Sequence, residues 1–232
     1  MKNSVAEHYT HGQLLDRILG GITSIGKTPA TVTVDDLAPV DEFHIGGRQA
    51  SEDFIGQLEL SADDHTLDVG CGLGGTSRFV ADRFGCRVTG IDLTPEFVTT
   101  GQTLCDWVGL SGLVELHQGD ATAMPFAGAS FDAAFMLHVG MNIADKVGLF
   151  AEVYRQIKPG ALFGVYDVML TGDEPLTDPV PWASVPGTSS LASQEQYIAA
   201  LEQAGFHIIK IRDRRGFAAE FFEETRRRME QA

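Results

Sequence analysis

Short apolar runs alternate with helical stretches over residues 66–214, and this alternation limits the available folds more than any other feature of the sequence. The apolar runs predict β-strands at residues 66–70, 87–93, 114–120, 131–139, 161–169 and 207–214. Helices are predicted at residues 75–84, 95–109, 144–157, 193–205 and 217–232. Strands of this kind separated by helices indicate a mostly parallel sheet covered on both faces. Right-handed crossovers then give an α/β, doubly wound sheet with a binding crevice beyond the carboxyl ends of its strands.

The N-terminal residues differ in texture from this core. Apolar residues near helical spacing predict helices at residues 5–22 and 48–60, whereas residues 28–47 resemble a loop because they contain two prolines and a Gly-Gly pair. We therefore divide the chain into a helical N-terminal cap at residues 1–60, an α/β core at 61–215 with a proline-rich insertion at 170–192, and a C-terminal helix at 216–232.

Charge and cysteine content narrow the classes of partner. The 232 residues carry 17 Lys and Arg against 32 Asp and Glu, which gives a net charge of −15 at pH 7. This charge repels nucleic-acid phosphates and anionic membrane surfaces, and no apolar run reaches the roughly 18 residues of a membrane helix. No nucleic-acid or membrane partner is therefore expected. Three cysteines without a C-x-x-C pair predict reduced thiols, a cytoplasmic location and no metal site.

The densest chemical signal is a glycine-rich turn, DVGCGLGG, between the first predicted strand and the helix that follows it. Its glycines allow a tight turn and a close approach of ligand to backbone, a pattern that dinucleotide-binding sites share. Acidic residues mark the ends of the first three strands, at Asp68, Asp92 and Asp120. Asp92 is placed to accept both hydroxyls of a ribose, and Asp120 to accept from an exocyclic amine. The charge of Asp68 beside the turn favours a cationic ligand over a pyrophosphate.

With these features the chain resembles the class I S-adenosylmethionine-dependent methyltransferases, in the stretches LDVGCGLGGTSRFVA, VTGIDLTPEFV, GDATAMPF, FDAAFMLHV and YRQIKPGALFGVYDV. The resemblance covers roughly residues 60–170 and is closest to small-molecule enzymes of the sarcosine/dimethylglycine, phosphoethanolamine and quinone-ring type. It implies a Rossmann-like methyltransferase fold and S-adenosyl-L-methionine as cofactor. By position it implies cofactor contacts from Asp68, Gly70, Cys71, Gly72, Asp92, Leu93, Asp120, Ala121 and His138.

The C-terminal part departs from the family pattern. The family sheet usually ends in a hairpin whose last strand runs antiparallel between the fifth and sixth strands. In this sequence a helix follows the sixth predicted strand, at residues 207–214, and a seventh strand is missing. We therefore predict an unusual sheet edge, which a partner chain, as in a homodimer, or an inward shift of the sixth strand would complete.

Residues that would cap the crevice are the candidates for binding the methyl acceptor: Tyr9, His44, His138, Met141, Asn142, Asp167 and Trp182. His138 is either the catalytic base or orienting group or a packed histidine. Met141 fits an apolar lining, Asn142 fits a helix cap better than a contact, and Trp182 either encloses an ammonium or anchors its loop. Asp167 faces either the acceptor or a backbone amide.

The predicted function is methyl transfer to a small-molecule acceptor, with an amine nitrogen slightly preferred, by in-line displacement that depends on positioning and desolvation. An oxygen or ring-carbon acceptor stays open. Two other classes also stay open, an NAD(P)-dependent oxidoreductase, because of the shared glycine pattern, and a non-catalytic protein that binds the same cofactor.

Overall fold

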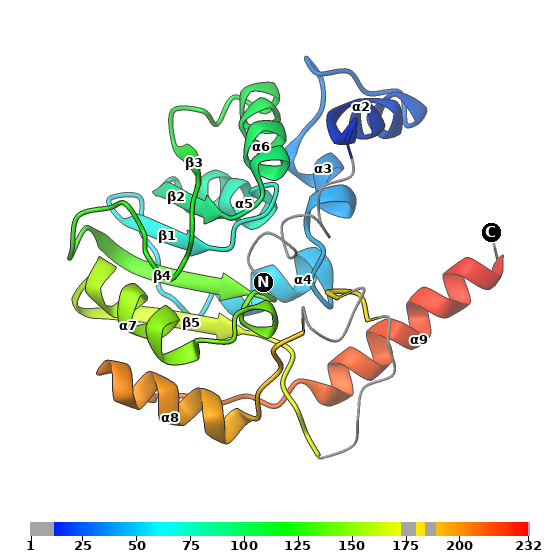
Figure 1. Cartoon of the computed structure of the whole chain (residues 1–232). Helices are drawn as coiled ribbons and strands as arrows, with labels where there is room; N and C mark the ends of the chain where they lie inside the picture. Colours follow the sequence, from blue (N-terminus) through cyan, green and yellow to red (C-terminus); the bar gives the residue numbers. More distant parts are fainter. Residues whose placement is uncertain (1–11, 173–179, 184–188, 232) are drawn as a thin grey trace.

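One parallel β-sheet lies at the centre of the computed structural model, which describes residues 12–172, 180–183 and 189–231 (Figure 1). Its strands are β1 (His65–Val69), β2 (Arg87–Asp92), β3 (Val114–Gln118), β4 (Phe131–Leu137) and β5 (Ile157–Tyr166). They lie in the order β3-β2-β1-β4-β5, and every pairing is parallel. The chain adds β2 and β3 on one side of β1 and β4 and β5 on the other, and this reversal of the strand order places a crevice at the carboxyl ends of β1 and β4. The predicted α/β, doubly wound architecture is confirmed.

Helices cover both faces of the sheet, and the apolar side chains of its strands pack against them (Figure 1). The helices of the core are α5 (Gly75–Phe84), α6 (Pro95–Trp107), α7 (Lys146–Gln156) and α8 (Gln194–Ala204). One apolar core joins α7 and α8 to the sheet, and another joins α5 and α6 to the opposite face. All four helices begin and end within two residues of their predicted bounds.

The N-terminal part contains α2 (Leu14–Ser24), α3 (Val34–Asp41) and α4 (Gly47–Ile55). The prediction of a loop throughout residues 28–47 was wrong, because α3 forms within it. A capping box starts α3: the Thr33 hydroxyl accepts from the Asp36 N–H, and the Asp36 carboxylate accepts from the Thr33 N–H. Pro39 lies inside this short helix, where it removes one intrahelical hydrogen-bond donor, so the capping box forms the helix in spite of the proline.

The sixth predicted strand, at residues 207–214, was also wrong: the structure has no strand there. Apolar and polar residues do alternate in this segment, but Ile209 and Ile211 are 79% and 53% exposed because no partner strand covers them. Among the described residues β5 pairs with β4 alone, so β5 forms an edge of the sheet. The expected unusual edge is therefore present, and no seventh strand occurs in the part of the chain that the structure describes.

The C-terminal helix α9 (Arg215–Gln231) extends away from the sheet (Figure 1). Its first turn is fixed to α4, because Arg214 pairs with Asp53 at 3.1 Å and lies over the ring of Phe217. The Phe217 ring lies so close to Gly46 that a Cβ there would come within 2.4 Å of it. Within the described residues no helix is both long and apolar enough to span a bilayer.

Candidate active site

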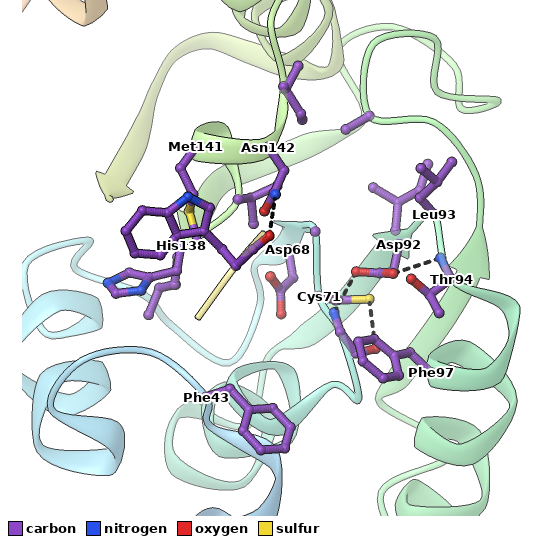
Figure 2. A pocket seen from close by; sticks show the side chains of 18 of the residues that line it. Phe43, Asp68, Cys71, Asp92, Leu93, Thr94, Phe97, His138, Met141 and Asn142 are labelled. Atoms are coloured by element: carbon purple, nitrogen blue, oxygen red, sulfur yellow. Dashed lines mark hydrogen bonds between the residues drawn. The ribbon is translucent and has the colours of Figure 1, made fainter. Parts of the chain in front are cut away.

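A cavity of about 750 Å³ lies at the carboxyl ends of the strands. Its walls come from the core, from the N-terminal cap and from the insertion, which contributes Pro181 and Trp182. Figure 2 shows two ends with Asp68 between them. We call the part around Asp92, Leu93, Thr94 and Phe97 the acidic end, and the part around His138, Met141 and Asn142 the histidine end.

The glycine turn forms the floor between the two ends. Gly70 and Gly72 have φ angles of 74° and 53°, in the left-handed region that favours glycine. A Cβ on Gly70 would lie 2.4 Å from Val139 Cγ2, whereas one on Gly72 would meet nothing within 4 Å. Gly70 is thus required by packing, and Gly72 leaves open space against the cavity. The same turn leads into α5, whose first backbone N–H groups have no partner within the helix.

Asp92 is held rigidly at the acidic end. Its carboxylate accepts hydrogen bonds from the backbone N–H of Gly72 at 2.9 Å and of Thr94 at 2.8 Å (Figure 2). Burial raises the pKa of Asp92, and these two bonds oppose the shift by stabilising the charged form. Each carboxylate oxygen can accept more than one hydrogen bond, so Asp92 can also hold a vicinal diol.

Asp68 lies at the middle of the cavity wall and is only 3% exposed. The Ser77 hydroxyl donates to it at 2.6 Å. Burial, with a smaller contribution from the charge of Asp92, raises the pKa of Asp68 to about 7, against the Ser77 hydrogen bond. A cationic ligand beside this side chain would favour its ionised form.

The third strand-end carboxylate also faces the cavity. Asp120 accepts from the N–H and the hydroxyl of Thr122, at 2.9 Å and 2.8 Å. Asp120, Ala121 and Leu93 all line the cavity, as do Gly70, Cys71 and Gly72. The structure thus brings the sequence-predicted residues of the glycine turn and the three strand ends together in a single cavity.

Two histidines meet at the histidine end. The ring centroids of His44 and His138 are 6.0 Å apart, and Tyr166 lies 5.1 Å from His138. His138 has a φ of 55°, a conformation that is costly for a residue with a side chain and that occurs often at functional sites. Burial, and then the proximity of His44, lowers the pKa of His138 to about 3. Its ring is therefore neutral at pH 7.

His44 is neutral as well, because burial lowers its pKa below the usual value. Its Nε2 lies 3.0 Å from the carbonyl oxygen of Gly47 and 3.0 Å from Ser51 Oγ. A carbonyl oxygen can only accept, so Nε2 carries the proton and Nδ1 is left as an acceptor. Tyr166 is fixed by donating its hydroxyl to the Ile45 carbonyl at 3.0 Å.

A 3-10 turn, η1 (Gly140–Asn142), connects the cavity to the insertion. The Asn142 side-chain amide donates to the Trp182 carbonyl at 2.8 Å (Figure 2), and the indole of Trp182 donates to Ser189 at 3.1 Å. Asn142 does not cap the following helix; Asp145 does, by accepting from the Gly148 N–H. Met141 is buried and lines the cavity, as an apolar wall residue should.

One candidate acceptor residue, Asp167, stands apart from the cavity. Asp167 is not among its lining residues: it accepts from the Tyr197 hydroxyl at 2.8 Å and from the Val168 N–H at 2.9 Å. Of the two orientations considered for Asp167, the backbone amide is thus the observed partner. Tyr9 lies outside the described residues.

Sequence reasoning missed several cavity residues, of which Asp41, Phe43 and Phe97 matter most. Phe43 is 73% exposed although it is large and apolar, and it directly precedes His44. Phe97 lies in the first turn of α6, three residues after Thr94, so its position beside the Asp92 strand end was a usable signal. Asp41 gave no signal, because its helix α3 was taken for a loop.

Asp41 connects the cap to the core. Its carboxylate pairs with the fully buried guanidinium of Arg78 on α5. Arg78 also donates to the carbonyls of Leu73 at 2.7 Å and Gly101 at 3.2 Å. Burial raises the pKa of Asp41 to about 6 in spite of this partner. The ionised carboxylate is therefore costly to bury, and its position depends on the contact with Arg78.

Among the described residues no group of three metal-ligating side chains is found.

Residues 67–165 match the family model described as a methyltransferase domain. The chain carries a methyltransferase domain. It is 32% identical over 165 residues to cycloartenol-C-24-methyltransferase 1 of Oryza sativa subsp. japonica, an alignment that covers 68% of this chain and 47% of that protein. The chain spans between 33% and 48% of the length of four curated relatives that it matches.

Solved methyltransferase structures share the fold. Phosphoethanolamine N-methyltransferase 2 of Haemonchus contortus, in complex with S-adenosyl-L-methionine, superposes with a TM-score of 0.73 at 24% identity, covering 83% of this chain and 44% of that one. Geranyl diphosphate C-methyltransferase of Streptomyces coelicolor A3(2) superposes with a TM-score of 0.63 at 23% identity, covering 71% and 62%. At these identities the likeness concerns the architecture of the methyltransferase domain.

Proposed function

We propose that this chain transfers a methyl group from S-adenosyl-L-methionine to a small-molecule acceptor. The observation that carries the proposal is the cavity itself, in which Asp68, Asp92 and Asp120 surround the glycine turn of a methyltransferase domain. When bound, the cofactor supplies a methyl group on a positively charged sulfur, which leaves as a neutral thioether. This departure needs no acid, so the protein contributes mainly position and dryness.

The residues of the acidic end fit the adenosine part of that cofactor. Asp92 would accept the ribose hydroxyls, Leu93 would pack on the adenine face, and Asp120 with Ala121 would contact its edge. Gly70, Cys71 and Gly72 would lie along the methionine part, where the open space above Gly72 accommodates it. The negative charge of Asp68 would attract the cationic sulfur and ammonium of this cofactor. The same charge would repel the pyrophosphate of NAD(P), which favours the proposed cofactor.

The histidine end would receive the acceptor, and we propose an amine nitrogen as the methylated atom. His138 and His44 are neutral rings that can accept a hydrogen bond from an N–H and orient its lone pair. A ring whose pKa lies near 3 is a poor proton acceptor at neutral pH, so this end favours a nucleophile that needs no deprotonation. An amine meets this requirement as its uncharged base, whose lone pair forms the new carbon–nitrogen bond before any proton is lost, whereas a hydroxyl must lose its proton to react. A ring carbon remains the second candidate.

Two measurements test the proposal. Thermal shift with S-adenosylhomocysteine and with NADH separates the cofactor classes, and stabilisation by NADH alone would overturn the proposed cofactor. Methyl-labelled cofactor with a panel of primary and secondary amines then tests the reaction, and NMR of the product locates the label. We expect label on nitrogen. Label on carbon or oxygen would replace the amine, and binding without any transfer would favour a non-catalytic protein.

Cellular location and assembly are further proposals. The three cysteines are unpaired and buried, which supports the proposed cytoplasmic, reducing environment. The β5 edge supports the proposed homodimer, because unpaired strand edges are surfaces on which another strand can add. Light scattering after size-exclusion chromatography tests the dimer, and a mass of one chain at micromolar concentration would contradict it.

A further inference from the structure

The charges around the cavity have one sign. Five of the described residues that line it are aspartates, and none is a lysine or an arginine. Three of these carboxylates, those of Asp68, Asp92 and Asp120, are assigned above to the cofactor. Asp41 is committed to Arg78, and Asp145 caps α7. An anionic ligand would therefore meet a wall without a compensating positive charge.

The cations on the surrounding elements are engaged elsewhere. Arg48 donates to Glu42 at 2.6 Å and to Asp35 at 2.9 Å. The guanidinium of Arg78 is fully buried and donates to the Leu73 carbonyl in the glycine turn. Lys146 donates its ammonium to the carbonyls of Ile143 at 2.5 Å and Ser190 at 2.7 Å. None of these side chains lines the cavity, and each already has its hydrogen-bond partners.

The remaining donors of the histidine end carry no charge either. Both of its imidazoles are neutral at pH 7, as described above. The amide of Asn142 is directed to the Trp182 carbonyl. By sequence, the insertion at residues 170–192 contains three acidic residues and no lysine, arginine or histidine. Outside the described residues the chain has a single lysine, Lys2, and no arginine.

Large apolar side chains complete this part of the wall. Phe43 comes from the cap, Met141 from η1 and Trp182 from the insertion, so three separate segments each present one. Phe43 stays 73% exposed, which leaves its ring available to a ligand. Apolar side chains from several segments around few polar groups are typical of sites for ligands with an apolar body.

On the basis of the proposed function, we infer that the methyl acceptor is a neutral or cationic small molecule with an apolar body, and that acceptors with a net negative charge are rejected. Removing a phosphate or carboxylate from water is costly unless a buried partner of opposite charge compensates it. The described side chains of the cavity provide no such partner. Selection here therefore acts through the missing positive charge as well as by apolar contact.

A charge-sorted extract tests this inference. Cell metabolites are divided at pH 7 into a pool that an anion exchanger retains and a pool that it does not, and the second pool is divided again on a reversed-phase column. Each pool is incubated with the protein and methyl-labelled S-adenosylmethionine. We expect labelled product from the unretained pool, in its reversed-phase-bound part. Label from the retained pool alone would overturn the inference while the proposed methyl transfer stands.

The other outcomes are equally decisive. Label confined to the hydrophilic part of the unretained pool would overturn the apolar body. Label in no pool would overturn the proposed function, and this inference with it. Binding of S-adenosylhomocysteine, followed in parallel by thermal shift, shows in each case that the cofactor site is intact.

A positive charge introduced at the wall sharpens the test. Phe43→Arg places a cation at the cavity, and we expect the share of label from the retained pool to rise about tenfold, the size of one charge-assisted hydrogen bond. Ile25→Arg is the matched control, because Ile25 is 58% exposed and does not line the cavity. An unchanged distribution of label in Phe43→Arg, or an equal change in both variants, would contradict selection by charge at this wall.

Discussion

The carboxylates at the strand ends differ in how strongly their surroundings fix them. Asp92 is held by two backbone N–H groups, and Asp68 by one hydroxyl. Both are buried beside a turn that has little side-chain volume of its own. Their charges are consequently costly in the empty protein, and a ligand with matching positive charge and hydroxyl groups relieves that cost.

Asp92→Ala tests the ribose assignment. It removes an acceptor that is already aligned by Gly72 and Thr94, so we expect binding of S-adenosylmethionine to weaken by about 1–3 kcal/mol. Isothermal titration calorimetry gives the affinity. Asp82→Ala, an exposed change on α5, is the control and should bind normally. Unchanged affinity in Asp92→Ala would rule the assignment out.

Asp68 predicts a pH dependence of cofactor binding. The pKa of its carboxyl is raised to about 7, chiefly by burial, so below that pH the empty site is largely protonated. A cation favours the ionised carboxylate, and binding at lower pH must release a proton. Affinity should therefore rise with pH between about 6 and 8, by up to about tenfold per unit at the acidic side. In Asp68→Asn this slope should vanish; a slope that persists would assign it to another group.

His138→Ala separates catalysis from cofactor binding. If the ring orients the acceptor, kcat should fall by about 10- to 100-fold, while the dissociation constant of S-adenosylhomocysteine changes little. Steady-state kinetics and calorimetry measure the two quantities. His117→Ala serves as the control, because His117 is a partly exposed residue of β3 that does not line the cavity. Equal turnover in both variants would return His138 to a packing role.

Residues at strand ends were the most predictable part of the site. Parallel strands end at one edge of their sheet, so the position of a residue along its strand was enough to place Asp68, Asp92 and Asp120 together. Beyond the strand end this reasoning fails. Asp167 turns away towards Tyr197, and Asp41 approaches from a helix that was predicted as a loop. Both placements depend on packing between elements that are distant in the chain.

At the scale of elements, the same distinction separates correct from incorrect predictions. Strands β1 to β4 and the four core helices formed within two residues of their predicted bounds because pattern and burial agree along them. Residues 207–214 carry the same alternating pattern, yet a strand also needs a neighbour to bond with. The helix α3 shows the opposite case, in which the local signal of Thr33 and Asp36 outweighed the proline that suggested a loop.

Lys146 joins three elements, and its replacement tests how the insertion is held. Its ammonium connects the segment after η1 to the segment before α8. Lys146→Met keeps the apolar stem and removes these bonds, so the wall around Trp182 should loosen. We expect KM for the acceptor to rise several-fold with little change in cofactor affinity. Lys158→Met, on an exposed ion pair with Asp132, is the control. A loss of cofactor affinity alone would contradict this role.

At the scale of the whole molecule, the pair of Arg78 and Asp41 joins the cap to the core. Arg78→Met would leave the Asp41 carboxylate buried without its partner, which costs about 3–5 kcal/mol of unfolding free energy. Urea denaturation followed by circular dichroism measures this loss. Arg83→Met, on the exposed side of α5, should cost less than about 0.5 kcal/mol. Comparable stability of the two variants would show that the cap does not depend on this pair.

One cavity draws its wall from Leu14 and Phe43 in the cap, Asp92 in the sheet and Trp182 in the insertion. A molecule bound there acts as a non-covalent crosslink between stretches of polypeptide that the sequence separates widely. A free ligand concentration of about a hundred times the dissociation constant raises the free energy of unfolding by about 2.7 kcal/mol. The concentration of the cofactor around the protein would thus set how often the chain unfolds and is exposed to proteases, in addition to its effect on the rate of the proposed reaction.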